Sequence, residues 1–589
     1  MKKLGVEYDT VGNEIILDDK NILRELMGNF RHIETTDPME CISSIAGVTI
    51  MPRAPVRIGA RLGRPEKAGE RKMKPKVHSL FPIENTGSSR RSIMDAAKSS
   101  HSKYEVEVNV RKCTNCNHVG PEVRCSECGS PMKDSGTYEK IKVDLSKIWN
   151  SALDNLGVSP NDLKEFKGVK KVMSKGKHVE PLEKGILRSL NNVSVNKDGT
   201  CRYDMSDVPI THFKSSEIFL PEEKAREIGY EPGMNELFTQ DIIIPMDCAR
   251  YLLNVSKYVD DLLEKYYKMD KFYNCRDESD LIGHIVIGLA PHTSGGIAGR
   301  IIGFSRVNGG YAHPFYHAAK RRNCDGDEDS VMLLMDGLLN FSKDFLPSTT
   351  GGLMDAPLVM TLLLRPDEVD KEALNVDSQS EYPLEFYEAT LKRIKPAEIE
   401  EMMKPVKYMV EKTGSARGMD FQFSTKDLNS GVLLSSYKTL ETMSEKIEKQ
   451  LNLAKIIRAV DQDDVASRLI NSHFLPDMFG NYRGFFSQEM RCTKCNAKYR
   501  RIPLSGKCQK CGNDNLILTI HRGGIVKYME ETRKLMKNFN LPPAQMYRIE
   551  NIFRSIDTSF NSTEDIQRVE THIENPLDNY GELEEEILE

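Results

Sequence analysis

The chain has 589 residues and a formal net charge of −5, a length that predicts about three to five domains. No N-terminal apolar run resembles a signal peptide, and no stretch approaches the roughly 18 apolar residues that cross a bilayer. We therefore expect a soluble cytoplasmic protein. The chain has 13 cysteines, most of them in two sets of four, so a disulfide framework is not expected.

The first fifty residues alternate two strand-like pieces, VEYDTV and NEIIL, with a predicted helix over residues 21–30. They lack the capped start that opens a self-contained domain. We therefore expect them to be the end of a module.

A strongly basic stretch follows, from Met51 to His78, in which the only acidic residues are Glu66 and Glu70. Its glycines and prolines argue against one continuous helix. Basic loops and short strands can bind a phosphate backbone, although a solvated surface explains the same composition. The acidic tail over residues 576–589 is expected to be solvated. The basic residues of the stretch are Arg53, Arg57, Arg61, Arg64, Lys67, Arg71, Lys72, Lys74 and Lys76.

Two sets of CxxC pairs predict two structural zinc ribbons. Residues 104–110 alternate apolar and polar side chains as a strand does, and they run into the first pair. Four thiolates fill the tetrahedral coordination sphere of zinc, so a catalytic zinc is not expected. The ligands are Cys113, Cys116, Cys125 and Cys128 in the first ribbon, and Cys492, Cys495, Cys508 and Cys511 in the second.

The middle of the chain predicts a helix over residues 247–273 and a buried strand over residues 284–290. The segment after this strand is rich in glycine, which lets a backbone approach a ligand closely. Its side chains offer hydrogen-bond donors, although a single histidine is more often structural than catalytic. The donors are His292, Thr293, Ser294, Arg300, His313 and His317.

The most informative motif is NCDGDED, residues 323–329, directly after the basic run HAAKRR. In an extended segment, alternate side chains leave the same face, so Asp325, Asp327 and Asp329 would converge. Hard divalent cations take carboxylate oxygens, and a metal pair can hold both the attacking and the leaving oxygen of a phosphoryl transfer. The motif therefore predicts a site for magnesium and phosphate.

An acidic motif of this kind has three other interpretations. A calcium-binding EF-hand would need Gly and Glu where this chain has Ser330 and Asp336. A solvated acidic turn is the second interpretation. The third concerns Asp329 alone: apolar side chains from Val331 to Leu339 follow a helical stripe, so Asp329 or Ser330 could be the N-cap of a helix.

After the motif, the chain is predicted to be mainly helical from about residue 368 to residue 471. Residues 435–460 are long, charged and amphipathic, which favours packing against a neighbour or along a duplex. Helices after the second ribbon, including residues 525–536, predict a packing or subunit-docking module.

Several long strings of this sequence closely resemble one family. They include GLAPHTSGGIAGRIIGF, YAHPFYHAAKRRNCDGDEDSVMLLMDGLLNFS, GGLMDAPLVMTLLLRPDEVD, IGARLGRPEKAGERKMKPKVHSLFPI and INSHFLPDMFGNYRGFFSQEMRCTKCNAKYRR, together with both ribbons. The family is the large subunit of the archaeal family D DNA polymerases, also called the DNA polymerase II large subunit. The resemblance runs from about residue 40 to residue 550.

The resemblance implies a multidomain α+β fold with two double-psi β-barrels at the catalytic centre, helical clamp-like modules and two zinc ribbons. Family members are roughly twice as long, so either the gene is split or this chain is a fragment. A separately encoded N-terminal half is expected to complete the large subunit. The expected domains are the end of an N-terminal module (1–45), the first, basic barrel (46–110, continued with connecting segments in 133–235), ribbon 1 (111–132), the second barrel (236–370), a clamp-like helical region (371–485), ribbon 2 (486–522), C-terminal helices (523–575) and the acidic tail.

The family's roles transfer to residues of this chain as expectations. Asp325 and Asp327 would bind two magnesium ions, with Asn323 and Asp329 beside them in the catalytic motif. The expected contacts to nucleotide or DNA are Arg61, Arg64, Lys67, Arg71, Lys72 and Lys74 from the first barrel, and Arg300, His313, His317, Lys320, Arg321 and Arg322 from the second.

The implied activity is that of a replicative DNA-directed DNA polymerase acting on template-primer DNA and dNTPs. Its 3′-5′ exonuclease is expected in a small partner subunit, bound near the C-terminal helices, and a sliding clamp is a further candidate partner. Two alternatives remain open. One is an RNA polymerase-like enzyme of the double-barrel type, and the other is a noncatalytic scaffold that binds DNA.

Overall fold

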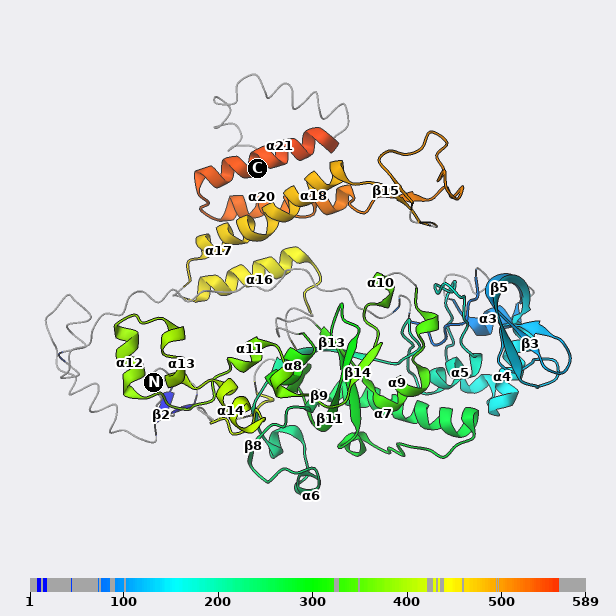
Figure 1. Ribbon diagram of the computed structural model, residues 1–589, viewed down its shortest axis with the longest axis horizontal. Helices are drawn as coiled ribbons and strands as arrows, with labels where there is room; N and C mark the ends of the chain where they lie inside the picture. Colours follow the sequence, from blue (N-terminus) through cyan, green and yellow to red (C-terminus); the bar gives the residue numbers. More distant parts are fainter. Residues whose placement is uncertain are drawn as a thin grey trace. The chain divides into compact units, whose positions relative to one another are not determined.

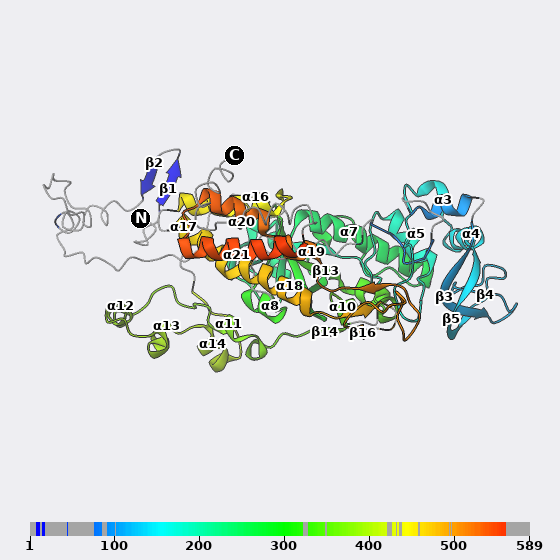
Figure 2. The same ribbon diagram turned by 90° about the horizontal axis from the view of Figure 1, so that it is seen from above.

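The computed structural model describes residues 8–11, 14–17, 44, 73, 76–84, 91–99, 102–321, 328–347, 350–420, 427–430, 433–434, 439–457, 460–493, 495 and 497–560 (Figures 1 and 2). The chain forms two compact units. One comprises Gly63–Met443, and the other comprises Met1–Leu62 with Ser444–Glu589. In the described ranges, no helix is both long and apolar enough to cross a membrane.

A seven-stranded mixed sheet is the centre of the larger unit (Figure 1). Its order is β10-β13-β6-β12-β9-β11-β14, and β10 also pairs with β11, so every strand except β14 belongs to a closed ring. The β6–β12, β9–β11 and β11–β14 pairs are parallel, and the others are antiparallel. The strands are β6 (Tyr203–Pro209), β9 (Asp241–Pro245), β10 (Ile285–Leu289), β11 (Gly295–Ser305), β12 (Gly309–Ala312), β13 (Glu328–Leu333) and β14 (Val359–Thr361).

The ring confirms the buried strand predicted over residues 284–290, which is β10. The ring also includes β6, which lies in the sequence before residue 236, the expected start of the second barrel. The sequence of β6, YDMSDVP, has few apolar residues and ends in proline, so it carries only a weak strand signal.

One apolar core joins the ring to the helices beside it. Trp149 of α4 stacks on Phe166, with ring centroids 5.3 Å apart, and Ile186 of α5 and Tyr258 of α7 belong to the same buried cluster. The predicted helix over 247–273 is confirmed as far as residue 267, because α7 continues into a π-helical turn, Leu262–Tyr267. These helices are α3 (Ile93–Lys98), α4 (Leu145–Leu156), α5 (Leu182–Leu190) and α7 (Met246–Asp261).

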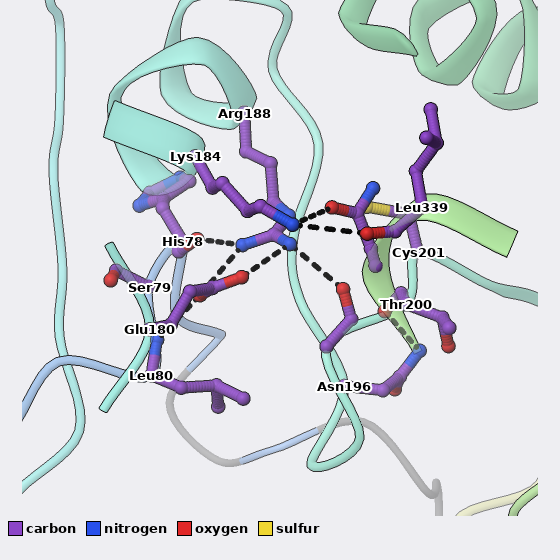
Figure 3. Close-up of polar contacts among 12 residues, drawn as sticks. His78, Ser79, Leu80, Glu180, Lys184, Arg188, Asn196, Thr200, Cys201 and Leu339 are labelled. Atoms are coloured by element: carbon purple, nitrogen blue, oxygen red, sulfur yellow. Dashed lines mark hydrogen bonds and ion pairs between the residues drawn. The ribbon is translucent and has the colours of Figure 1, made fainter. Parts of the chain in front are cut away.

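A buried ion pair ties the segment that follows the basic stretch to this core (Figure 3). The guanidinium of Arg188, on α5, donates to both carboxylate oxygens of Glu180 at 2.9 and 2.7 Å, and to the carbonyl oxygen of His78 at 3.1 Å. Glu180 also accepts from the backbone N–H of Leu80 at 3.0 Å. Lys184, one turn earlier on α5, donates to the carbonyl oxygen of Leu339 at 3.0 Å. Residues 78–80 are therefore held by side chains inside the protein.

The apolar stripe after the acidic motif is a strand first and a helix second. Val331, Met332 and Leu333 complete β13, and α9 (Leu334–Asn340) begins only after them. The prediction that Asp329 or Ser330 caps a helix is therefore wrong. Val331, Met332 and Leu333 are all buried, because β13 lies inside the sheet between β10 and β6. Such a strand has no alternating pattern to distinguish it from a buried helix.

Shorter elements complete the larger unit. Its first ribbon is a three-stranded sheet in which β3 confirms the strand predicted over 104–110. Residues 371–413 form short helices. The elements are β3 (Lys103–Cys113), β4 (Val119–Gly120), β5 (Met132–Asp144), β7 (His212–Lys214), α6 (Glu222–Glu227), β8 (Met234–Glu236), α8 (Pro314–Ala319), α10 (Thr350–Leu353), α11 (Lys371–Leu374), α12 (Leu384–Leu391), α13 (Glu400–Met403) and α14 (Val406–Thr413).

The smaller unit is mainly helical. Phe474 and Tyr528 stack in its core with ring centroids 4.5 Å apart. The helix expected over 435–460 is confirmed for Met443–Ile456, and the helices around 525–536 are also present. The elements are α16 (Met443–Ile456), α17 (Gln462–Leu469), a π-helical turn (Ile470–Phe474), α18 (Leu475–Ser487), β15 (Met490–Cys492), β16 (Lys498–Tyr499), β17 (Leu516–Ile517), α19 (Arg522–Val526), α20 (Met529–Asn538) and α21 (Pro543–Phe560).

The two predicted strand-like pieces are confirmed as strands, β1 (Tyr8–Val11) and β2 (Glu14–Leu17), and they pair in an antiparallel hairpin. The helix expected over 21–30 lies outside the described residues.

Candidate functional site

The acidic motif lies between a helix and a central strand of the ring. Helix α8 ends at Ala319 with Lys320 as its C-cap, and β13 begins at Glu328. Residues 322–327 lie outside the described part of the chain, and with them Arg322, Asn323, Asp325 and Asp327. The structure therefore defines the two ends of the segment that carries the predicted magnesium ligands.

These two ends are joined by a buried ion pair. The ammonium of Lys320 donates to Asp329 Oδ2, and the two side chains are only 3% and 1% exposed. The ammonium also lies 4.9 Å from the ring centroid of Tyr316. Burial lowers the pKa of Lys320, but the charge and hydrogen bond of Asp329, together with the charges of Tyr316 and Asp207, raise that pKa above its usual value. The lysine is therefore positively charged.

Asp207 of β6 and His317 of α8 lie beside this pair. His317 Nδ1 is 3.8 Å from Asp207 Oδ2, and its Nε2 donates to the carbonyl oxygen of Val208 at 3.2 Å. One ligand atom from each of Asp207, His317 and Asp329 lies within 4.8 Å of the others. A cavity of about 10 Å³, room for about one water molecule, is lined by these three residues and Lys320.

Glycines of β10 and β11 make room for α8. A β-carbon on Gly288 would lie 2.5 Å from Tyr316 Oη, and one on Gly299 would lie 2.9 Å from it. The Tyr316 hydroxyl donates to the carbonyl oxygen of Ile297 at 3.1 Å. Gly299 belongs to the glycine-rich segment whose backbone is predicted to approach a ligand, whereas Gly288 lies in the predicted buried strand. In the structure, both glycines leave room for Tyr316 of α8.

His313 is the N-cap of α8 and is fully buried. Its Nδ1 accepts from the backbone N–H of Phe315 at 3.2 Å, which satisfies one of the free donors at the start of the helix. Burial lowers the pKa of His313 to about 4, so the imidazole is neutral at pH 7.

Two of the arginines predicted to contact nucleotide or DNA, Arg300 and Arg321, form ion pairs with different aspartates. Arg300 of β11 forms a two-pronged ion pair with Asp241 of β9, with N···O distances of 2.8 and 2.6 Å. Tyr230 also donates to Asp241, at 2.6 Å, so this carboxylate holds both side chains. Arg321 has a left-handed backbone, with φ of 65°, and an exposed side chain that reaches Asp370 at 3.1 Å.

The remaining predicted contacts come from the basic stretch. Arg61, Arg64, Lys67, Arg71, Lys72 and Lys74 all lie outside the described residues. The segment that follows them, residues 76–84, is held by Glu180 and Arg188. The structure thus describes the contacts made at the C-terminal end of the basic stretch, and not those of its six predicted nucleotide-binding residues.

The first cysteine set is brought together by the sheet of β3, β4 and β5. Cys113 Sγ is 3.5 Å from Cys128 Sγ, and Cys116 Sγ is 3.5 Å from Cys125 Sγ. Tetrahedral thiolates about 2.3 Å from a zinc ion lie slightly under 4 Å apart, so the four sulfurs fit this ion. The backbone N–H of Asn115 points at Cys113 Sγ at 3.3 Å, as expected for a CxxC knuckle.

The second set has the same arrangement in the smaller unit. Cys492 Sγ is 3.5 Å from Cys511 Sγ, and Cys495 Sγ is 3.4 Å from Cys508 Sγ. Asn513 donates to Cys492 Sγ at 3.4 Å. Both predicted four-cysteine sites are therefore assembled in the fold, and both can bind zinc.

Sequence reasoning missed Asp207 and Asp241. Each is a buried carboxylate on a ring strand, far along the chain from its basic partner. Neither lies in a motif. The single available signal for each was an aspartate inside a short strand-like stretch. That signal becomes informative only when the neighbours of β6 and of β9 in the sheet are known.

Comparison with known proteins identifies relatives of this chain. Residues 159–446 match the family model described as "DNA polymerase II large subunit DP2, catalytic domain", and residues 1–147 match its central domain. The DNA polymerase II large subunit of Thermoplasma volcanium is 56% identical over 573 residues, and that of Thermoplasma acidophilum is 57% identical over 580. The Archaeoglobus fulgidus protein of the same name is 47% identical over 582 residues.

These alignments cover 95%, 96% and 92% of this chain, and 53%, 53% and 51% of the three relatives. The molecule is a mixed α+β protein with a large mixed sheet and two four-cysteine sites. The chain belongs to the family of DNA polymerase II large subunits. It spans about half the length of these relatives.

Proposed function

We propose that this chain is the catalytic part of a replicative DNA-directed DNA polymerase. The observation that carries the proposal is the match of residues 159–446 to the family's catalytic domain, because this range contains the whole ring and the NCDGDED motif. The chain spans about half of its named relatives, so the activity is proposed for an assembly that contains it.

In this proposal, the closed ring of strands is the second double-psi barrel. Its support is the mixture of parallel and antiparallel pairs and the closure of β10 on β11. The first barrel would carry the basic stretch. Glu180 and Arg188 hold the segment directly after this stretch, and Lys184 of the same helix contacts α9, which directly follows β13.

The catalytic roles follow from charge and position. Asp325 and Asp327 would hold two magnesium ions, with Asn323 beside them. Magnesium held there would make the primer 3′-hydroxyl more acidic and would stabilise the charge that develops on the leaving pyrophosphate. The six arginines and lysines predicted from the first barrel, with Arg321 and Arg322, would bind the triphosphate or the DNA backbone. No side-chain nucleophile is required, because positioning and electrostatics carry this reaction.

The partners are proposed on the same basis. A separately encoded N-terminal half would complete the large subunit. A small subunit would supply the 3′-5′ exonuclease and bind near residues 523–575, where α19, α20 and α21 lie. In the described residues, the one carboxylate–histidine cluster is Asp207–His317–Asp329, directly beside the polymerase motif, so no separate exonuclease site is proposed in them. A sliding clamp is a further candidate partner.

Primer extension tests the proposal. The chain is co-expressed with candidate N-terminal and small subunits, and the purified complex is assayed on a DNA primer-template with magnesium. We expect incorporation of dNTPs and little incorporation of NTPs. Preferential use of NTPs would indicate an RNA polymerase-like enzyme. No incorporation of either, by a complex that binds the DNA, would indicate a noncatalytic scaffold.

A further inference from the structure

The loop between β10 and β11, residues 290–294, lies at the end of the ring where β13 begins. Leu289 is the last residue of β10, and it pairs with Ser330 of β13 and with Gly296 of β11. β13 runs antiparallel to β10 and begins at Glu328, which belongs to the acidic motif. Because paired strands lie about 4.8 Å apart, the first residues of the loop are close to the start of β13.

The hydrogen-bond donors predicted in the glycine-rich segment differ in whether they can reach a ligand. Two are hydroxyl groups that donate to backbone carbonyl oxygens, one is an arginine bound to Asp241, and two are buried histidines. These five are Thr293, Ser294, Arg300, His313 and His317. The sixth, His292, is exposed, and in the described ranges its imidazole forms no hydrogen bond or ion pair. An imidazole offers an N–H donor in either protonation state, which suits a phosphate oxygen.

We propose that His292 donates a hydrogen bond to a phosphate oxygen of nucleotide or DNA bound at this end of the ring, and that Asp355 is the positioning residue that holds His292. The inference rests on the proposed polymerase function and deepens it, because it adds a substrate contact and the support of that contact.

His292 and Asp355 hold each other in an unusual backbone conformation. Both are left-handed, with φ of 58° and 60°. The backbone N–H of His292 donates to Asp355 Oδ1 at 2.7 Å, and the backbone N–H of Asp355 donates to the carbonyl oxygen of Thr293 at 2.9 Å. A left-handed backbone is unfavourable for a residue with a β-carbon, so it persists where neighbours fix it, and such residues cluster at ligand sites.

The turn that carries Asp355 is fixed on its buried side. Its carbonyl oxygen accepts from Arg202 at 2.7 Å, and this arginine is only 5% exposed and is paired with buried Asp198. Lys197 donates to the carbonyl oxygen of Met354, also at 2.7 Å. The turn is therefore anchored to the segment before β6, so that Asp355 can hold His292 at the exposed side.

The role given to Asp355 needs an acceptor oxygen and not a negative charge. Its Oδ1 accepts the backbone N–H of His292, and the amide oxygen of an asparagine can accept the same bond. A metal ligand would instead depend on the charge of the carboxylate. The two roles therefore predict different behaviour for Asp355→Asn.

His292→Gly tests the phosphate contact in the assembled polymerase. Glycine adopts a left-handed backbone without strain, so this variant removes the imidazole and keeps the loop. Loss of one hydrogen bond to a phosphate should weaken binding by about tenfold. A raised KM for dNTP with an unchanged Kd for primer-template DNA would assign the contact to the nucleotide, and the reverse would assign it to the DNA backbone. Wild-type values of both, with or without a change of kcat, would overturn the inference.

Two variants of Asp355 test the positioning role. Asp355→Ala removes the acceptor and should weaken the same binding step as His292→Gly, and the double variant H292G/D355A should bind no more weakly than the weaker single variant. Asp355→Asn keeps an acceptor and tolerates the left-handed backbone, so it should bind almost like the wild type and still tests the role if Asp355→Ala does not fold. Binding by Asp355→Asn that is about tenfold weaker would overturn the positioning role.

Lys268→Gly is the matched control, because Lys268 is also exposed and left-handed, with φ of 59°, and it follows α7 and its π-helical turn outside this loop. It should keep the KM and Kd of the wild type, and an equal weakening in this variant would overturn the assignment of His292. The proposed function fails in a different way, since the wild-type complex itself would then show no polymerase activity.

Discussion

The hydroxyl of Tyr316 lies where a side chain on Gly288 would have to be: a β-carbon there would approach Tyr316 Oη to 2.5 Å. Gly288 is on β10 and Tyr316 is on α8, the helix that leads into the acidic motif. This contact lets the helix lie directly against the closed ring. It links a glycine-rich string of the sequence to the placement of the motif.

Gly288→Ala is therefore expected to destabilise the fold by about 1–3 kcal/mol, because the added methyl group must displace a buried tyrosine. Gly295→Ala is the control, since a β-carbon at Gly295 would meet nothing within 4 Å. Urea unfolding of both variants measures the difference. Equal stabilities of the two variants would contradict this account of the glycines.

Acid should destabilise the protein through His313. Burial lowers the pKa of His313 in the folded state to about 4, below the value of 6.5 expected when unfolded. The unfolded state therefore binds more protons between these values, so the stability present above pH 6.5 is lost as the pH falls towards 4. The expected loss from this residue between pH 7 and pH 5 is about 2 kcal/mol.

His313→Asn is the informative variant for this prediction. Asparagine is a good N-cap and can accept from the N–H of Phe315, but it does not titrate. The free energy of unfolding of the variant, measured in urea at pH 7 and pH 5, should fall less than that of the wild type. A variant with the full wild-type pH dependence would show that His313 is not responsible.

Metal analysis tests the two ribbons. The purified chain is expected to hold two zinc ions, one for each four-cysteine site. Cys125→Ser should lose one zinc ion and destabilise the sheet of β3, β4 and β5. Cys275→Ser, at a buried cysteine outside both sets, should retain two. A wild-type chain without bound zinc after purification in metal-containing buffer would exclude the assignment.

The buried pair of Arg188 and Glu180 should contribute far more to stability than an exposed pair. Glu180→Ala leaves the guanidinium buried without its counter-ion, which is expected to cost about 3–5 kcal/mol. Glu368→Ala removes the exposed partner of Arg365 and should change the free energy of unfolding by less than about 1 kcal/mol. Thermal unfolding measures the loss of stability in each variant. Similar losses in the two variants would contradict the stabilising role of the buried Arg188–Glu180 pair shown in Figure 3.

Local patterns were sufficient for several parts of the fold. The CxxC pairs predicted both four-cysteine sites, because zinc ligands come from short, regular spacings. The alternation in residues 104–110 and the apolar run at 284–290 predicted β3 and β10. The long family strings predicted the family itself, which the comparisons confirm.

Pairings between distant segments could not be predicted in this way. Asp207 reaches its place beside His317 only because β6 pairs with both β12 and β13. The stripe from Val331 resembled a helix because a strand buried on both faces loses its alternation. The interior position of Lys320 was also hidden, since its neighbours in the sequence are basic and its partner is Asp329, nine residues away.

Primer extension by Asp325→Asn and Asp327→Asn most directly tests the central claim, that these two carboxylates hold the metal ions of a polymerase. Asp344→Asn, at an exposed aspartate of the same unit, is the control. We expect both motif variants to fold and bind primer-template DNA like the wild type and to lose dNTP incorporation by at least about 1000-fold, whereas the control keeps it. Extension by either motif variant at a rate near that of the wild type would contradict the account.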